Sequence, residues 1–219
     1  MTKKIFLGGG GNETQAKEID DLYGKTVGAG AKVLYIPIAW TKPEQFNSCL
    51  DWFENSYARF DFEIEMLTDL DDVKYSFLEK FDSIYIGGGN TFALLKTLKE
   101  SNFVEVLNAF IDSGRAVYGG SAGAIVLGKD ISTAFIGNQT DENKVQLTDF
   151  TGLNVSNGYS IKAHYEKEED VVKKFSIENN TPVLNIPEEG GVFIDGNKMT
   201  LVGNVEIIDS LQKSSNIIP

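Results

Sequence analysis

Residues 115–124, Arg-Ala-Val-Tyr-Gly-Gly-Ser-Ala-Gly-Ala, join a short apolar run to a segment that is compatible with a helix. Within this stretch Gly119, Ser121 and Gly123 have the spacing of a nucleophile elbow, a sharp strand-to-helix turn that exposes a serine hydroxyl. Glycines on both sides remove side chains that would collide in such a turn. The N–H of Ala122 would then face the oxygen of a carbonyl attacked by Ser121. A tight glycine turn after a buried strand fits the same spacing, so the rest of the sequence must decide.

Apolar runs and helical patterns alternate before this stretch. This alternation predicts an α/β fold, a three-layer α/β/α sandwich around a mostly parallel, doubly wound sheet. We predict strands near 3–8, 32–38, 62–67 and 83–86, and helices near 13–29, 43–59 and 71–80 and twice between 91 and 112.

Shorter β-like pieces follow residue 130. We expect them at 131–136, at 158–163 and in the last forty residues, where a tight turn at Asp195-Gly196 joins two strands. A charged helix is predicted at 167–179. No linker or domain boundary is evident, so we predict one domain covering residues 1–219.

Three glycine-rich turns, at 8–11, 87–89 and 119–123, each follow a predicted strand. Parallel strands end at the same edge of a sheet, so these turns should open toward one crevice. The first turn has Glu13 where a dinucleotide-binding motif needs its third glycine, and no Gly-Lys-Ser or Gly-Lys-Thr phosphate loop occurs. The turn at 87–89 could bring backbone N–H groups close to a substrate oxygen, or could be a loop that needs positive φ.

Composition excludes several classes of function. The net charge of −12 argues against a general role in binding nucleic acid or anionic membranes. No apolar stretch is long enough for a membrane helix, and the first residues predict a strand rather than a signal peptide. Cys49 is the only cysteine, which excludes an intrachain disulfide, and its helical spacing predicts a place in the core. We therefore expect a cytoplasmic protein.

A serine needs a base, and the chain offers one histidine, His164, at the end of a predicted strand. The base needs an acceptor that orients it. Glu188 and Glu189 lie in a turn between two apolar strands, and spacing alone does not choose between them.

Four motifs in order resemble those of the peptidase E family: Ile-Gly-Gly-Gly-Asn-Thr at 86–91, Gly-Gly-Ser-Ala-Gly-Ala at 119–124, Ala-His-Tyr at 163–165 and Ile-Pro-Glu at 186–188. These serine peptidases include aspartyl dipeptidase and, more distantly, cyanophycinase. The resemblance spans nearly the whole chain. It implies a fold like that of the class I glutamine amidotransferases, which is flavodoxin-like.

The resemblance also implies roles for particular residues. Ser121 would be the nucleophile, His164 the general base and, by similarity to cyanophycinase, Glu188 the third member. The oxyanion hole and substrate contacts would come from backbone groups of Gly88, Gly89 and Ala122.

The sequence departs from peptidase E in two places. An aspartate about fifteen residues after the nucleophile is the acid in peptidase E, whereas residues 131–136 contain no carboxylate. This favours Glu188 or a Ser-His dyad. The resemblance to aspartyl dipeptidase also implies an arginine near the catalytic histidine, which binds the carboxylate of the substrate. Here the only arginines are Arg59 and Arg115, while lysines occur at 162, 167, 173 and 174.

The sequence therefore predicts a serine exopeptidase that acts on dipeptides or other short peptides, with an N-terminal acidic residue as one possible preference. We expect neither metal nor cofactor, and a monomer or homodimer. Two alternatives remain: an esterase or amidase for a small metabolite, and a catalytically silent protein that binds a small molecule.

Overall fold

Strands and helices alternate along the computed structural model, which describes residues 2–40 and 42–209. Residue 1 and residues 210–219, the two ends of the predicted domain, lie outside the described residues. Within the described ranges, the larger of two sheets has seven strands in the order β3-β2-β4-β5-β1-β8-β9. These strands are β1 (Lys4–Gly8), β2 (Lys32–Ile36), β3 (Glu63–Met66), β4 (Ser83–Ile86), β5 (Ala116–Gly120), β8 (Gly191–Asp195) and β9 (Lys198–Val202).

The first five of these strands in the chain run parallel, and β8 and β9 add an antiparallel edge. Gly8 pairs with Gly120 and Ile86 pairs with Gly119, so β1, β4 and β5 end level with one another. The turns after these strands therefore surround one point, the residue that follows Gly120. The predicted doubly wound, mostly parallel sheet is confirmed.

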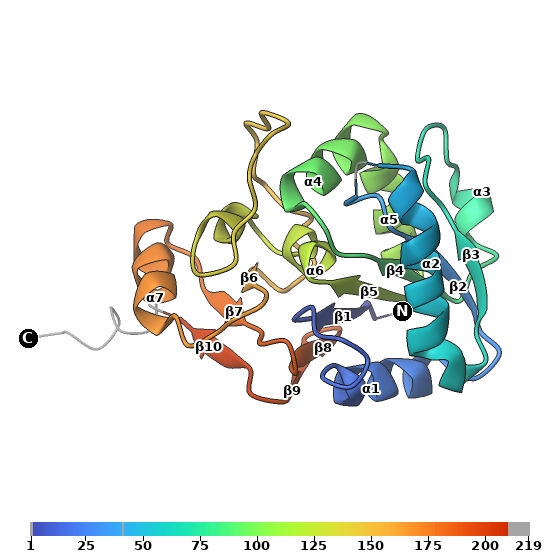
Figure 1. Ribbon diagram of the computed structural model, residues 1–219, viewed down its shortest axis with the longest axis horizontal. Coiled ribbons are helices and arrows are strands. Elements are labelled where there is room, and N and C mark those ends of the chain that lie inside the picture. Colours follow the sequence, from blue (N-terminus) through green and yellow to red (C-terminus); the bar gives the residue numbers. More distant parts are fainter. Residues whose placement is uncertain (1, 41, 210–219) are drawn as a thin grey trace, which may run out of the picture.

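Helices cover both faces of this sheet, as Figure 1 shows. The helices that cover it are α1 (Lys17–Val27), α2 (Glu44–Tyr57), α3 (Tyr75–Leu78), α4 (Thr91–Glu100), α5 (Phe103–Asp112) and α6 (Ala122–Leu127). A further helix, α7 (Glu169–Glu178), lies away from this sheet, and the 3₁₀ turns are η1 (Ala58–Phe60) and η2 (Ser132–Phe135). Ile5 and Leu7 of β1 pack with the face that carries α4, α5 and α6, whereas Phe6 packs with α1 and α2. Alternate residues of one strand thus enter two cores, the pattern of a strand buried on both sides.

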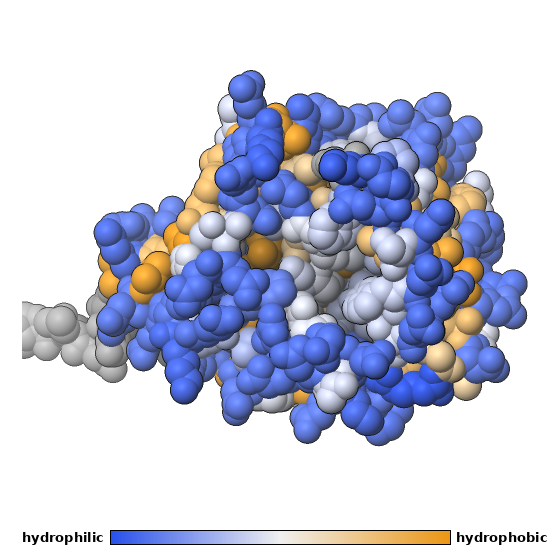
Figure 2. All heavy atoms as spheres, in the orientation of Figure 1, coloured by the Kyte–Doolittle hydropathy of each residue, from blue (hydrophilic) through white to orange (hydrophobic). Residues whose placement is uncertain are grey.

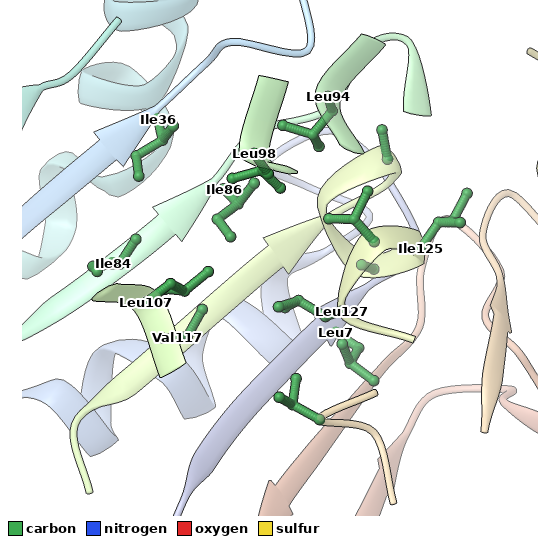
Figure 3. Packing of buried hydrophobic residues seen from close by; sticks show 14 of the residues in the cluster. Leu7, Ile36, Ile84, Ile86, Leu94, Leu98, Leu107, Val117, Ile125 and Leu127 are labelled. Atoms are coloured by element: carbon green, nitrogen blue, oxygen red, sulfur yellow. The ribbon is translucent and has the colours of Figure 1, made fainter. Parts of the chain in front are cut away.

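The core on the α4–α6 face is mainly aliphatic, although Phe92, Phe103 and Phe110 are also buried in it (Figure 3). Leu94 and Leu98 of α4 and Leu107 of α5 pack against Ile86 and Val117 of the sheet, and all five are fully buried. This packing fixes α4 and α5 against β4 and β5, the two strands that end in glycine turns.

A second sheet has three strands in the order β10-β7-β6 and lies beside the first (Figure 1). Its strands are β6 (Ser160–Lys162), β7 (Val183–Asn185) and β10 (Glu206–Ile208). His164 follows β6 by two residues and Glu188 follows β7 by three. Since β6 and β7 are parallel neighbours, they deliver both side chains to the same end of this sheet.

Three predicted elements need correction. The predicted strand at 131–136 is wrong, because these residues form the 3₁₀ turn η2, in which Asp130 accepts the N–H of Ser132 and the Thr133 hydroxyl donates to Ile161 O. The helix predicted at 71–80 is limited to α3. The helix predicted at 13–29 begins later, at Lys17.

A buried carboxyl lies under the elbow strand on the α1 face. Asp20 of α1 is 3% exposed, and its Oδ1 accepts hydrogen bonds from the hydroxyls of Tyr57 (2.8 Å) and Tyr118 (2.9 Å). Loss of solvation raises the pKa of Asp20 from an ordinary 3.8 to about 6, although both tyrosine hydrogen bonds and Arg59 oppose the shift.

We expect this carboxyl to make the protein less stable as the pH rises. Between about pH 4 and 6 the folded protein keeps the proton that the unfolded chain has lost, so the free energy of unfolding falls by about 3 kcal/mol over this range. Asp20→Asn removes the titration. Denaturant unfolding measured from pH 4 to 7.5 should show that the free energy of unfolding of wild type falls by this amount relative to that of the variant. A constant difference between the two would contradict the assignment.

Candidate active site

Ser121 occupies the turn between β5 and α6 with φ 52° and ψ −115°, a backbone conformation that non-glycine residues rarely adopt. Its N–H donates to Gly8 O at 3.0 Å, and its C=O accepts from the N–H of Ala124 at 2.9 Å. A Cβ at Gly119 would lie 2.4 Å from Gly123 O, and one at Gly123 would lie 2.2 Å from Ile86 O. Both glycines of the motif are therefore required by the close approach of the backbone, as the sequence predicts.

The imidazole of His164 lies beside this serine. Ser121 Oγ and His164 Nε2 are 2.8 Å apart, and the backbone N–H of His164 donates to Gly9 O at 3.0 Å. A Cβ at Gly10 would lie 2.3 Å from His164 Cε1. The first glycine turn, which has no motif function in the sequence, thus leaves the space that the imidazole occupies.

Glu188 reaches the other nitrogen of the same ring. Its Oε1 lies 3.2 Å from His164 Nδ1, which sets the ring to carry its proton on Nδ1 and to offer Nε2 as an acceptor to the Ser121 hydroxyl. Glu188 is therefore the glutamate that contacts the imidazole. The neighbouring Glu189 is exposed to solvent.

Gln15, a residue that the sequence does not single out, holds the far side of this carboxylate. Its Nε2 donates to Glu188 Oε2 at 2.7 Å, while its Oε1 accepts the N–H of Asn12 at 3.1 Å. The Gln15 hydrogen bond, followed by the contact with His164, keeps the pKa of Glu188 below its usual range against the opposing effect of partial burial. The carboxylate is consequently ionised at neutral pH. No local pattern could identify Gln15, because 173 residues separate it from its partner.

The predicted oxyanion residues lie close to the serine. A Cβ at Gly88 would be 3.5 Å from Ser121 Oγ, so the Gly88 backbone passes beside the hydroxyl. Ala122 is the first residue of α6, and its N–H is one of the donors that a helix leaves free at its start. Gly89 has φ 139°, and a Cβ there would meet Ala39 O at 2.7 Å. This turn therefore needs a glycine conformation, as one of the two sequence interpretations predicts, and it also borders the serine.

All three glycine turns open into one cavity of about 710 Å³, as expected from the ends of the parallel strands. Gly10, Gly88 and Gly120 line it together with Ser121 and His164. Figure 2 shows the hollow near the centre of the face at which the strands of Figure 1 end.

Lys162 brings a buried cation to this cavity. Its side chain is 2% exposed, and its Nζ donates to Gln139 O at 3.1 Å. Within residues 2–40 and 42–209 no carboxylate lies within ion-pair distance of Nζ. Burial lowers the pKa of Lys162, and the nearby charges of Glu168 and Asp141 oppose that shift.

Asp141 also lines the cavity but holds a loop rather than the histidine. Its Oδ2 accepts the N–H of Thr91 at the start of α4 at 2.8 Å, and the Asn90 side chain donates to Glu142 O at 3.0 Å. These contacts attach the loop after η2 to the N-terminus of α4. The negative charge of Asp141 is favourable there, because the helix dipole is positive at that end.

Neither arginine lines the cavity. Arg59 pairs with Asp21 at 3.0 Å, and Arg115 lies over the ring of Phe110 at 5.4 Å. Cys49 is only half-buried and borders the cavity, so its predicted place in the core is only partly correct.

Across the described ranges, no three His, Cys, Asp or Glu side chains gather closely enough to hold a metal ion. No described helix is long and apolar enough to cross a bilayer.

Known proteins that are similar in sequence to this chain belong to one peptidase family. The sequence pattern of peptidase family S51 matches residues 5–202. Peptidase E of Actinobacillus pleuropneumoniae serotype 7 (strain AP76) is 28% identical over 193 residues, which cover 82% of this chain and 78% of that one. Peptidase E of Pasteurella multocida (strain Pm70) is 30% identical over 145 residues, 60% of this chain and 58% of its own.

Solved structures share the fold. A candidate peptidase E protein from Listeria monocytogenes EGD-e superimposes with a TM-score of 0.72 at 23% identity, covering 92% of this chain and 98% of that one. A peptidase from an acI-B1 actinobacterium gives 0.69 at 18% identity, covering 96% and 92%. Because the family pattern covers most of the sequence, this chain belongs to peptidase family S51, the peptidase E family of serine peptidases.

Proposed function

We propose that this protein is a dipeptidase that uses Ser121 as nucleophile, His164 as general base and Glu188 as the group that orients His164. One observation carries the proposal: the continuous series from Ser121 Oγ to His164 Nε2 (2.8 Å) and from His164 Nδ1 to Glu188 Oε1 (3.2 Å), at the border of the cavity. The contact between Ser121 and His164 supports this role, because a serine hydroxyl becomes nucleophilic only when a base accepts its proton, and a carboxylate on the other ring nitrogen orients that base.

The reaction follows from these contacts. Ser121 Oγ attacks the peptide carbonyl carbon as its proton moves to His164 Nε2, and the N–H groups of Gly88 and Ala122 stabilise the negative oxygen. Glu188 stabilises the imidazolium that forms. His164 then gives the proton to the leaving amine, which departs and leaves an acyl group on Ser121. Water attacks this ester with His164 as base, and the free acid and the serine are restored.

The cavity suits a short substrate. A volume of about 710 Å³ is in the range of small-molecule sites, and the loop that Asp141 attaches to α4 closes one side of it. Hydrolysis of unblocked dipeptides with Asp, Glu, Gly or Leu at the N-terminus tests the proposal by release of the free amino acids. Cleavage of at least one member is expected. Turnover of simple acyl esters only would indicate the esterase, and ligand-induced stabilisation with no turnover would indicate the binding protein.

Lys162 gives a physical reason for an acidic substrate residue. A buried ammonium with one carbonyl partner can bind a carboxylate through a charge-assisted hydrogen bond. We therefore expect cleavage of Asp-X and Glu-X dipeptides to exceed that of Leu-X. The cytoplasmic location and a monomer or homodimer stay predictions.

Replacing this lysine should affect acidic substrates selectively. Lys162→Met should lower kcat/KM for Asp-X roughly 10- to 100-fold, the effect of losing a hydrogen bond to a charged group, and should change Leu-X much less. The exposed Lys167→Met is the matched control, with no expected change. An equal loss for Asp-X and Leu-X would show that Lys162 only supports the fold.

A further inference from the structure

Both tryptophans of the chain border the cavity that holds Ser121. Trp40 lies in the connection after β2 and Trp52 lies in α2, and they are 43% and 41% exposed. Burial of a large aromatic side chain is strongly favourable. Two half-exposed indoles that border one cavity therefore suggest that a bound ligand covers them.

The wall that carries these indoles is anchored in the core. Phe53, fully buried, lies 6.3 Å from Trp52 between ring centroids and stacks on Tyr35 at 4.3 Å. Tyr85 meets the same phenylalanine edge-on at 4.8 Å. These packed rings hold the part of α2 that carries Trp52 in a fixed place, and a wall that is already in place lowers the entropic cost of binding.

Charge is distributed unequally around the cavity. The lining residues from β2, the following connection and α2 are Tyr35, Trp40, Ser48, Cys49 and Trp52, and none of them is charged. Lys162 and Asp141 lie on the part formed by β6 and the loop after η2. Figure 1 shows α2 and β6 on opposite sides of β5, the strand that ends at Ser121. The serine therefore stands between a polar wall and an aromatic wall.

We infer that Trp40 and Trp52 form a subsite for a bulky apolar side chain, aromatic or branched aliphatic, of the peptide that is cleaved. This inference rests on the proposed dipeptidase function. When the scissile peptide bond of a dipeptide lies at Ser121, its two residues extend to opposite sides of the serine. One side chain can then face Lys162 while the other contacts the indoles. The favoured substrate class is a dipeptide with one acidic and one bulky apolar residue.

The test uses intrinsic fluorescence, because the only tryptophans of the chain are these two. Ser121→Ala is titrated with Asp-Gly, Asp-Leu and Asp-Phe, so that binding is measured without turnover. We expect the Kd to fall roughly 10- to 100-fold from Asp-Gly to Asp-Phe, the gain from burying a phenyl side chain. Equal affinity for Asp-Gly and Asp-Phe overturns the inference.

Two variants locate the subsite. Trp40→Ala and Trp52→Ala should each reduce the ratio of kcat/KM for Asp-Phe over Asp-Gly, mainly through KM. Leu201→Ala is the control, because this leucine of β9 is equally exposed, at 41%, and lies away from the cavity lining. An unchanged ratio in both tryptophan variants contradicts the inference.

Failure of the subsite and failure of the proposed function are distinguishable. If wild type cleaves no dipeptide, the proposed function fails, and the titration still measures whether the wall binds an apolar side chain. If wild type cleaves dipeptides with no preference between Gly and Phe, and the titration agrees, only the subsite is wrong.

Discussion

Replacing Ser121 by alanine should lower kcat/KM for every cleaved dipeptide by about 10⁵-fold. Removal of the nucleophile from a serine hydrolase abolishes the covalent route and leaves only the contribution of the oxyanion donors and of substrate binding. Alanine retains Cβ, so the turn with φ 52° need not change. Substrate affinity should remain, because the hydroxyl contributes mainly to the transition state. Steady-state kinetics with product analysis measure the change.

Ser101→Ala is the matched control for this variant. Ser101 follows α4 and is not among the residues that line the cavity, and its hydroxyl donates to Thr97 O at 2.7 Å rather than to an imidazole. Activity within a few-fold of wild type is expected. If Ser121→Ala keeps a normal circular dichroism spectrum and a tenth or more of wild-type activity, Ser121 is not the nucleophile.

Replacing Glu188 by glutamine should lower kcat about 10³-fold with little change in KM. The carboxylate oxygen that faces His164 Nδ1 at 3.2 Å can only accept, which fixes the proton on Nδ1. A glutamine can turn its amide N–H toward the ring and stabilise the opposite tautomer, in which Nε2 cannot accept the Ser121 proton. It also lacks the charge that stabilises the imidazolium.

Glu189→Gln tests the same chemistry one residue away. Glu189 is exposed, so we expect unchanged kinetics from this variant. A Ser-His dyad predicts a different outcome, with both glutamine variants retaining activity within about 10-fold of wild type. That result would remove Glu188 from the mechanism while leaving Ser121 and His164 in place.

The sheet could be predicted because its central strands are buried on both faces. Ser83–Ile86 is a short apolar run followed by glycine, and the structure gives β4 these limits. The apolar run before Ser121 is also a strand, β5 (Ala116–Gly120). Helix starts were less predictable. The side chain of Asn12 accepts the N–H groups of Thr14 and Gln15, so a turn replaces the first helical residues that periodicity suggests.

The error at residues 131–136 has a different cause. Isoleucine, threonine and phenylalanine in a short run suggest a strand. Here Ile131, Thr133 and Ala134 are buried under β6 by tertiary contacts, and the Asp130 side chain starts a 3₁₀ turn. A run of six residues has too few periods to separate these two outcomes.

Some residues of the candidate site could likewise be predicted from local sequence, and others could not. Ser121 could be found from local spacing, because the steric demand of the turn acts on adjacent glycines. His164 is the only histidine. Glu188 required a resemblance to a family, since Glu189 has the same chemistry. Gln15 and the environment of Lys162 depend on contacts between distant segments, which no local pattern encodes.

The most direct test of the account is the position of the acyl group during turnover. Wild type is mixed with an activated acyl ester, quenched in acid within the first turnovers, and analysed by intact mass and peptide mapping. We predict one acyl group, on Ser121, and none in Ser121→Ala. An adduct on Cys49, which borders the same cavity, or an equal adduct in Ser121→Ala would contradict the claim that Ser121 is the nucleophile.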